Sequence, residues 1–289
     1  GPFRLSPDQS WCGRTINALG EPVDGFGPLT QGPASRPVTG AAPASMLRQR
    51  VDKPLKTGIR VVDVFTPMCQ GQRLGVFAGS GVGKSTFLGS LAAGLEADRV
   101  VIALIGERSR EVNEFVRNVL PKSIMSKTVV VAATASEPPG AKKRAAYCAI
   151  TAAEHFRDEG HNVLFLFDSI TRFAEAHRET ALMAGETPAL NAFPPSTVRV
   201  ISELAERAGP GLDDKGDITA IYSVLVAGSD MEEPVADMIR GILDGHIILS
   251  RQIAERQRYP AIDVLRSVSR ALPHACLLYT SPSPRDQAK

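Results

Sequence analysis

The stretch "AGSGVGKST", residues Ala78–Thr86, decides the fold of this chain. It follows an apolar run typical of a strand, and it matches the P-loop pattern G-x-x-x-x-G-K-[ST], except that Ala78 stands where the pattern has its first glycine. Glycines at these positions let backbone N–H groups turn inward around phosphate oxygens, where side chains would clash. A glycine turn with only a structural role would not need a Lys-Ser pair at this point. We therefore interpret the stretch as a phosphate-binding site.

The residue types of this loop predict ATP and Mg²⁺ as its ligands. Lys84 would place a cation on the β- and γ-phosphates, and Ser85 would offer a hydroxyl ligand to Mg²⁺. The N-terminus of the helix that begins here adds its partial positive charge. The other nucleotide-binding positions that the pattern predicts are Gly79, Ser80, Gly81, Val82, Gly83 and Thr86.

Apolar segments of strand length alternate with helical patterns along the chain. The expected strands are Arg73–Gly79, Arg99–Gly106, Thr128–Thr134, Asn162–Asp168 and Ile218–Gly228. Strands separated by amphipathic helices predict an α/β fold, in which a mostly parallel sheet is flanked by helices on both faces. Ligands of such sheets bind outside the carboxyl ends of the strands, which is where the P-loop falls.

A P-loop needs a carboxylate for its metal ion, and Asp168 ends the apolar strand "NVLFLFD". The alternative is that Asp168 caps the helix that follows. Beside a P-loop, the metal-binding interpretation is the stronger one, so Ser85 and Asp168 are the predicted Mg²⁺ residues, in part through water.

A third polar segment, "GERSRE", follows another buried strand and belongs to the same edge of the sheet. Glu107 is the candidate for orienting and polarising the attacking water, a role worth roughly 10² to 10⁴ in rate. Arg108 would reach the γ-phosphate. The alternative is a solvated helix start, where a glutamate complements the helix dipole, and Glu111 fits that alternative better than Glu107 does.

Composition limits the class of protein without identifying it. The chain has 289 residues, with 43% hydrophobic and 22% charged residues, which is enough for one large core. A formal net charge of +2 gives no reason to expect nucleic acid or an anionic membrane as a partner. The four cysteines are widely spaced and predict neither a zinc site nor a disulfide framework. Apolar runs are far shorter than the roughly 20 residues of a membrane-spanning helix.

Several motifs in order carry a resemblance to a known family. They are "AGSGVGKS", "GERSRE", "FLFDSITRFAEAHRE", "FPPSTVRVISELAERAG" and "SRQIAERQRYPAIDVLRSVSR". Together they resemble the flagellar protein-export ATPases, which belong to the type III secretion ATPases and are related to the catalytic subunits of rotary ATP synthases. The resemblance implies a RecA-like P-loop core, preceded by a small β-barrel and followed by a helical C-terminal domain.

The resemblance also assigns roles that the residues alone do not. It gives Lys84, Glu107, Arg108 and Asp168 the roles described above, and it places the ring of Tyr259 on the adenine, although a tyrosine in a core is the ordinary alternative. Arg270 matches the arginine finger, which acts in trans on the nucleotide of the next subunit. An arginine on a surface helix is the competing interpretation.

The partners implied by the resemblance are those of an export motor. They are identical subunits in a closed ring, expected to be a hexamer, together with the flagellar export apparatus, its regulator and stalk proteins, exported substrates and their chaperones. No nucleic acid is expected. The location implied is the cytoplasm, at the inner face of the membrane and peripheral to it through the export gate.

Both ends of the chain look cut. We expect residues 1–26 to be the remnant of the β-barrel, 27–54 to be a connector rich in proline and glycine, and 55–275 to be the ATPase domain. Residues 276–289 contain "CLLYTSPSPRD", which matches a sequencing adapter translated in frame, so we expect a non-native tail. The helical C-terminal domain is expected to be absent.

Three other functions remain open at this level. A virulence-type secretion ATPase shares the core motifs, and the stretch "AGETPALNAFPPSTVRVISELAERAG" favours the flagellar type by resemblance alone. A catalytic subunit of a rotary ATP synthase usually has a stricter glycine-rich loop. An RNA translocase of the transcription-termination kind would need stacking aromatic residues in an oligonucleotide-binding domain, yet the chain has one Trp and four Tyr.

Overall fold

The computed structural model describes residues 1–189, 193–227 and 231–271. The predicted adapter-derived tail, residues 276–289, therefore lies outside the described residues, as do residues 272–275 at the end of the predicted ATPase domain.

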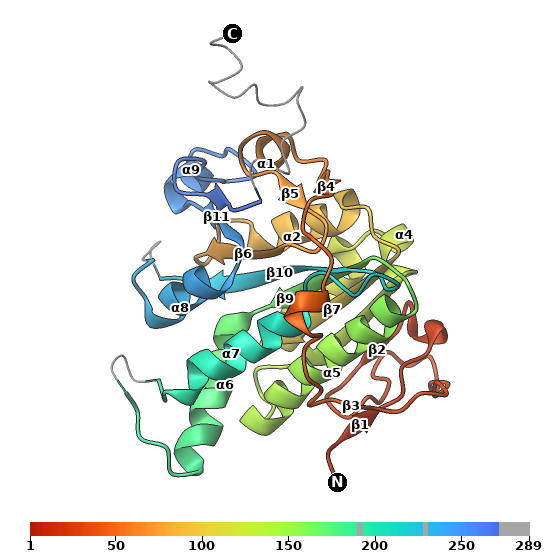
Figure 1. The fold of residues 1–289 in the computed structure, drawn as a ribbon. Helices are drawn as coiled ribbons and strands as arrows, with labels where there is room; N and C mark the ends of the chain where they lie inside the picture. The colour runs from red at the N-terminus through yellow and green to blue at the C-terminus, as the bar shows by residue number, and fades with distance from the viewer. Residues whose placement is uncertain (190–192, 228–230, 272–289) are drawn as a thin grey trace.

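A sheet of eight strands, counted over the described residues, runs through the centre of the molecule (Figure 1) in the order β12-β11-β6-β10-β9-β7-β8-β2. All neighbours in it are parallel except β12, which is antiparallel to β11. The strands are β2 (Thr15–Ile16), β6 (Arg73–Ala78), β7 (Arg99–Ile105), β8 (Thr128–Ala133), β9 (Val163–Asp168), β10 (Ile218–Leu225), β11 (Gly245–Leu249) and β12 (Val268–Ser269).

The five strands expected from the apolar runs are the five in the middle of this sheet, β6, β10, β9, β7 and β8, so the predicted α/β class is confirmed. The three strands that were not expected are β2, β11 and β12, of two, five and two residues. Two short antiparallel pairs lie outside the sheet. They are β1 (Arg4–Leu5) with β3 (Arg36–Pro37), and β4 (Pro54–Leu55) with β5 (Met68–Cys69).

Helices cover both faces of the sheet. One face packs against α5 (Pro139–Asp158), α6 (Ile170–Met183), α7 (Ser196–Arg207) and α8 (Pro234–Ile242). The other face packs against α1 (Arg60–Phe65), α2 (Lys84–Gly94), α3 (Ser109–Glu114) with the π-helical turn η3 (Phe115–Val119), α4 (Lys122–Met125) and α9 (Arg251–Glu255). Two short 3₁₀ turns, η1 (Gln9–Trp11) and η2 (Ser45–Leu47), lie in the N-terminal part.

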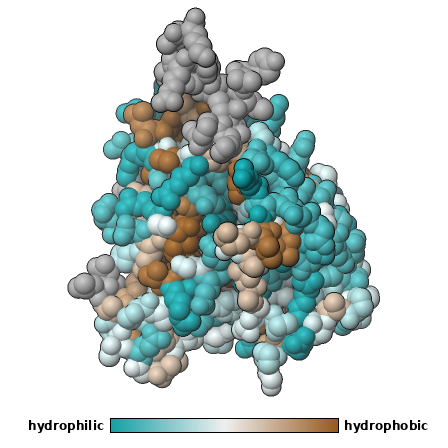
Figure 2. All heavy atoms as spheres, in the orientation of Figure 1, coloured by the Kyte–Doolittle hydropathy of each residue, from teal (hydrophilic) through white to brown (hydrophobic). Residues whose placement is uncertain are grey.

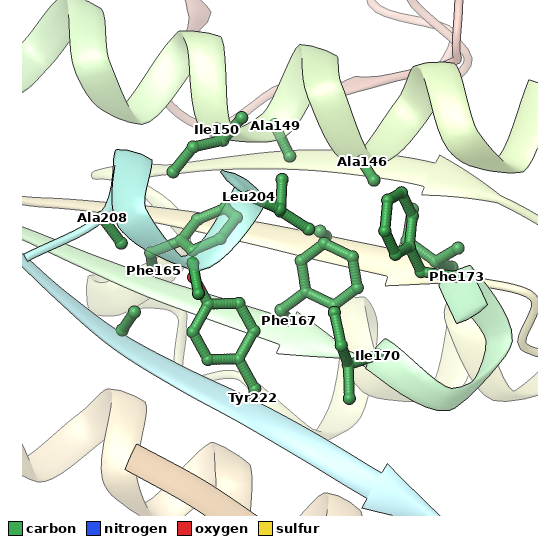
Figure 3. Packing of buried hydrophobic residues seen from close by; sticks show 14 of the residues in the cluster. Ala146, Ala149, Ile150, Phe165, Phe167, Ile170, Phe173, Leu204, Ala208 and Tyr222 are labelled. Carbon is green, nitrogen blue, oxygen red and sulfur yellow. The ribbon is translucent and has the colours of Figure 1, made fainter. Parts of the chain in front are cut away.

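The alternation of side chains along β9 divides the core into two layers. Phe165 and Phe167 point toward α5 and join the cluster on that face, whereas Leu164 and Leu166 join the cluster around α2. Figure 3 shows Phe165, Phe167 and Tyr222 of the neighbouring strand packed beneath α5. The rings of Phe165 and Tyr222 meet edge to face, with centroids 6.1 Å apart. Because every residue of β9 is buried, its sequence is a continuous apolar run up to Asp168.

The N-terminal segment is attached to the edge of the same sheet. Strand β2 pairs in parallel with β8, and Trp11 is fully buried in the cluster on the α5 face. The indole N–H of Trp11 donates to the carbonyl of Thr30 at 2.6 Å. The assignment of residues 1–26 to the remnant of a β-barrel stays a prediction.

The surface is mostly polar, with local apolar groups. Figure 2 shows hydrophobic side chains gathered in several places on the face viewed in Figure 1, between hydrophilic ones. The turn η2, orange in Figure 1 and on this face, carries Met46 and Leu47, both well exposed. Within the described residues, no helix has the length and apolar character needed to span a membrane.

Candidate nucleotide-binding site

The P-loop connects the carboxyl end of β6 to the first turn of α2, which begins at Lys84. Gly81 and Gly83 have φ angles of 75° and 85°, a region that residues with a Cβ adopt only with strain. At Gly79 the limit is space, because a Cβ there would lie 3.2 Å from the carbonyl oxygen of Val226. The three glycines therefore permit a backbone cradle that other residues would distort or fill.

A cleft of about 970 Å³ opens beside this loop, at the carboxyl edge of the sheet. The loops after β6, β7, β9 and β10 all contribute to its walls, as expected for a parallel sheet. The residues that sequence analysis singled out and that line it are Gly79, Ser80, Gly81, Gly83, Lys84, Ser85, Thr86, Glu107, Arg108 and Asp168. Val82 instead packs its side chain into the core around α2.

Lys84 is held at the floor of the cleft by two carboxylates. Its Nζ lies 2.6 Å from Oδ1 of Asp168 and 3.8 Å from Oε1 of Glu107. Burial by itself lowers the pKa of Lys84, but the attraction of Asp168 and Glu107 outweighs it, so the pKa is raised. Asp168 also accepts a hydrogen bond from the hydroxyl of Ser223 on β10.

Glu107 lies in the loop between β7 and α3, and its side chain is largely buried. Burial, followed by repulsion from Asp168, raises its pKa to about 7, against the opposing attraction of Lys84, and the nearby Glu111 adds to the rise. The Oε1 atom of Glu107 is buried and accepts no hydrogen bond from the described residues. A carboxylate with this pKa and an unused acceptor is suited to polarising a bound water near neutral pH.

These residues fit a nucleotide with its metal ion. The cradle of the P-loop glycines suits phosphate oxygens, and Lys84 supplies the positive charge. Oxygen donors suit Mg²⁺, and Ser85 and Asp168 both present oxygen atoms to the same cleft. The unused Oε1 atom of Glu107 lies 3.8 Å from Nζ of Lys84, which itself contacts Asp168.

The helix-capping alternative for Asp168 is wrong. Asp168 is the last residue of β9, and the cap of α6 is the next residue, Ser169, whose hydroxyl accepts from the N–H of Arg172 at 3.3 Å. The side chain of Asp168 is therefore free of the capping role and turns into the cleft.

The core alternative for Tyr259 is also wrong, because this residue is 62% exposed. Its ring lies against the P-loop, where a Cβ built on Gly83 would come within 3.4 Å of the ring edge. An exposed aromatic face beside the phosphate loop is placed where a base could stack on it.

Arg108 and Arg270 lie at opposite edges of the sheet. Arg108 lines the cleft and is exposed. Arg270 lies in the turn after β12 and not on a helix, so the surface-helix interpretation is wrong. The backbone N–H of Arg270 donates to the carbonyl of Asp244. The backbone N–H of Asp244 in turn donates to the carbonyl of Arg73, at the start of β6. Since β6 rises about 3.3 Å per residue, Arg270 is about 17 Å from the P-loop of its own chain, beyond the reach of its side chain.

Further cleft residues were missed by sequence analysis. They are Lys142, Thr171, Arg172, Glu175, Glu179, Glu233 and Arg251, and Glu111 lines the cleft as well as lying in the first turn of α3. The rule that loops after parallel strands line the site would have found Thr171 and Arg172, which follow Asp168 by three and four residues. Arg251, whose guanidinium donates to the carbonyl of Ser80 at 3.4 Å, follows β11, and that strand was not expected.

A P-loop on a parallel sheet, with two carboxylates around its lysine, defines a P-loop nucleotide-binding domain. The model of the nucleotide-binding domain of the ATP synthase alpha/beta family matches residues 58–269. The chain belongs to that family.

Curated relatives narrow the similarity further. The chain is 56% identical over 270 residues to the flagellum-specific ATP synthase of Agrobacterium fabrum, which covers 93% of this chain and 57% of that protein. It is 46% identical over 271 residues to the type 3 secretion system ATPase of Xanthomonas euvesicatoria, covering 94% and 61%. The chain thus spans about three-fifths of the length of these relatives.

Solved structures show the same fold. An ATPase from the type III secretion system of pathogenic bacteria superposes with a TM-score of 0.91 at 43% identity, covering 96% of this chain and 80% of that one. The assembled ATPase EscN of enteropathogenic E. coli gives a TM-score of 0.89 at 44% identity, covering 94% and 65%. A second structure of EscN contains its central stalk EscO.

Proposed function

We propose that the protein hydrolyses ATP to ADP and phosphate and that it does so as a subunit of a flagellar protein-export motor. The observation that carries the proposal is Glu107, a buried carboxylate with an unused oxygen 3.8 Å from the P-loop lysine. Its pKa near 7 suits a group that must accept a proton in one step and release it in another.

Each residue of the cleft has a part in this reaction. The backbone N–H groups of the P-loop and Lys84 bind the β- and γ-phosphates. Glu107 orients the attacking water and accepts its proton as the bond from water to the γ-phosphorus forms and the bond to the leaving ADP oxygen breaks. Arg108 contacts the γ-phosphate, and Tyr259 stacks on the adenine. Ser85 and Asp168 would hold Mg²⁺, in part through water, and the ion would supply positive charge to the phosphates.

The last residue of the site comes from another subunit. Arg270 is about 17 Å from its own P-loop by the rise of β6, so it acts on the nucleotide of a neighbour. An arginine finger of this kind is worth about 10³ to 10⁵ in rate. Head-to-tail contacts of one kind of chain generate a closed ring, for which we propose a hexamer. The assembled structure of EscN supports this proposal.

Export of flagellar proteins is the proposed cellular role. Two flagellum-specific relatives, at 56% and 54% identity, support it; two type 3 secretion system ATPases have 46%, a value within the range of 44% to 56% that flagellum-specific relatives span. A stalk protein, a regulator, chaperones and exported substrates are the proposed partners, and the structure of EscN with EscO supports the first of these. The proposed location is the cytoplasmic face of the membrane at the export gate.

Complementation of a deletion strain tests the proposal. The complete gene should restore both ATPase activity in the purified protein and secretion of flagellar filament proteins, and Glu107→Gln should restore neither. Normal filament secretion in the deletion strain, with loss of virulence-type secretion instead, would favour a second candidate function, that of a virulence-type secretion ATPase. A purified full-length ring that did not hydrolyse ATP would contradict both.

A further inference from the structure

Helix α8 connects the nucleotide cleft of this chain to its own arginine finger. It is the crossover between β10 and β11, so it begins at the carboxyl edge of the sheet and returns to the amino edge. Glu233, the residue before the helix, lines the cleft. At the other end, the carbonyl of Arg240 accepts a hydrogen bond from Nη2 of Arg270 at 3.3 Å.

The cleft end of α8 is tied to the P-loop through two short contacts. The N–H of Val226 donates to the carbonyl of Ala78, the first residue of the P-loop, at 3.1 Å. The N–H of the next residue, Ala227, donates to Oε1 of Glu233 at 2.9 Å. Glu233 therefore joins the strand end that supports the P-loop to the start of α8.

The finger end of α8 is suited to hold a guanidinium. The last carbonyls of a helix have no partner within the helix, and they carry the negative end of its dipole. Arg270 donates to one of them, while its backbone N–H is fixed to Asp244 at 3.0 Å. The direction of the finger thus depends on where the C-terminus of α8 lies.

Between its ends, α8 is packed as a rigid element. Val235, Ala236 and Ile239 are buried against the sheet, which fixes the helix sideways. The hydrogen bond that Glu233 accepts is directional and lies at the start of the helix, so it adds a restraint on the axial position of α8. A misplacement of about 1 Å in a catalytic group can cost roughly 100-fold in rate.

We propose that Glu233 is a positioning residue for Arg270: through α8, a side chain in the cleft of one subunit sets the aim of the finger which that subunit offers to its neighbour. The inference rests on the proposed ATPase function with a finger in trans. The proposed function gives Glu233 no part. The inference assigns its effect to the subunit that supplies the finger at an interface, and not to the subunit that supplies the cleft.

Mixed rings of the full-length protein separate the two sides. Subunits carrying Arg270→Ala can donate only a cleft, and subunits carrying Glu107→Gln can donate only a finger. An equal mixture should be competent at about a quarter of its interfaces, and the finger contribution of about 10³ or more makes this recovery measurable. ATP hydrolysis by the parent ring, and its recovery when the two inactive variants are mixed, test the proposed function. Absence of the rescue would overturn the finger in trans and this inference with it.

The test adds a second change to one donor at a time. Glu233→Asp, which keeps the charge but is too short to reach Ala227, should lower the recovered kcat about tenfold when it is on the finger donor. The same change on the cleft donor should alter the activity by less than about twofold, with KM unchanged in both mixtures. Glu233→Gln, whose amide oxygen can still accept from Ala227, should leave the activity near that of the parent mixture.

A matched control removes a carboxylate from the neighbouring helix without touching α8. Glu203→Ala on α7, whose side chain is exposed and paired with Arg199, should have no effect on either donor. Ring assembly is measured by light scattering for each mixture. The inference is overturned by no loss from Glu233→Asp on the finger donor, or by a loss on the cleft donor that equals or exceeds it.

Discussion

Nζ of Lys84 and Oδ1 of Asp168 form a 2.6 Å ion pair between the first residue of α2 and the last residue of β9. The pair joins the end of the P-loop to the end of β9, which is separated from β6 by β10, so the proposed phosphate-binding and metal-binding side chains are in direct contact. Because both side chains are largely buried, removing either one would leave an uncompensated charge in the cleft.

Lys84→Ala should abolish tight ATP binding. It removes the only lysine that the structure brings to Asp168 and Glu107 among the described residues, and it leaves these two carboxylates to repel the phosphates. We expect the affinity for a fluorescent ATP analogue to fall at least about tenfold, since a hydrogen bond to a charged group contributes roughly 1.5–3 kcal/mol. Lys122→Ala, on the surface helix α4, is the control and should bind as the parent does. Equal binding by both variants would contradict the assignment.

Glu107→Gln should separate binding from hydrolysis. The amide is of similar size and leaves the P-loop intact, but it cannot accept the proton of the attacking water. We expect kcat to fall by about 10² to 10⁴ while the Kd for ATP changes little. Single-turnover measurement with the full-length ring distinguishes the chemical step from product release. A variant with normal turnover would show that another group activates the water.

The pKa of Glu107, about 7, should appear in the pH dependence of two properties. In the proposed role Glu107 accepts a proton and must be deprotonated, so kcat/KM should rise as the pH increases through about 7, and Glu107→Gln should lose this rise. The folded-state pKa lies above the ordinary glutamate pKa of 4.5, so the contribution of Glu107 to stability is fully present below pH 4.5 and is lost as the pH rises through 7. The Tm of Glu107→Gln relative to the parent should therefore increase from pH 5 to pH 8. A constant difference in Tm would contradict the raised pKa.

Tyr259 should contribute its ring and not its hydroxyl. Tyr259→Phe keeps the face beside Gly83 and should bind ATP nearly as the parent does. Tyr259→Ala should weaken binding about tenfold, since stacking of a base on an aromatic side chain is worth about 1–3 kcal/mol. Calorimetry with ATP, and with inorganic triphosphate as a ligand that lacks the base, provides the check. Tyr259→Ala should leave triphosphate binding unchanged.

Arg270→Ala should remove catalysis without removing binding. In a ring made only of this variant, every site lacks the finger, so kcat should fall about 10³-fold or more with little change in the Kd for ATP. Arg270→Lys should recover little of this loss, because an ammonium does not reproduce the planar fork of a guanidinium. Arg199→Ala, an exposed arginine on α7, should behave like the parent. If Arg270→Ala weakened nucleotide binding and left kcat intact, the finger role would be excluded.

The centre of the sheet was predictable because its strands are buried on both faces, which makes each of them an uninterrupted apolar run such as that of β9. The P-loop and Asp168 were predictable for a related reason, since polar residues that end such runs must meet at one edge. Strand β11 was not expected because it has five residues and includes His246. Strands β2 and β12 have two residues each, and long-range pairing, which no local pattern indicates, places them in the sheet.

The placement of Arg270 shows the same limit at the candidate site. Its motif could be recognised, but its separation from the P-loop depends on the antiparallel pairing of β12 with β11. The same holds for Glu233, which is one acidic residue among several in the sequence until the structure places it in the cleft. The catalytic roles of all these residues stay predictions for the experiments above.

The burial of Trp11 has a spectroscopic consequence. It is the only tryptophan of the chain, and it lies near the start of β8, at the amino edge of the sheet, where the N–H of Gly13 donates to Thr128. Its intrinsic emission should therefore report whether the N-terminal segment is docked on the core, and nucleotide at the opposite edge should leave that signal unchanged. One chromophore thus follows the attachment of this segment during unfolding, while ATP binding needs a label of its own.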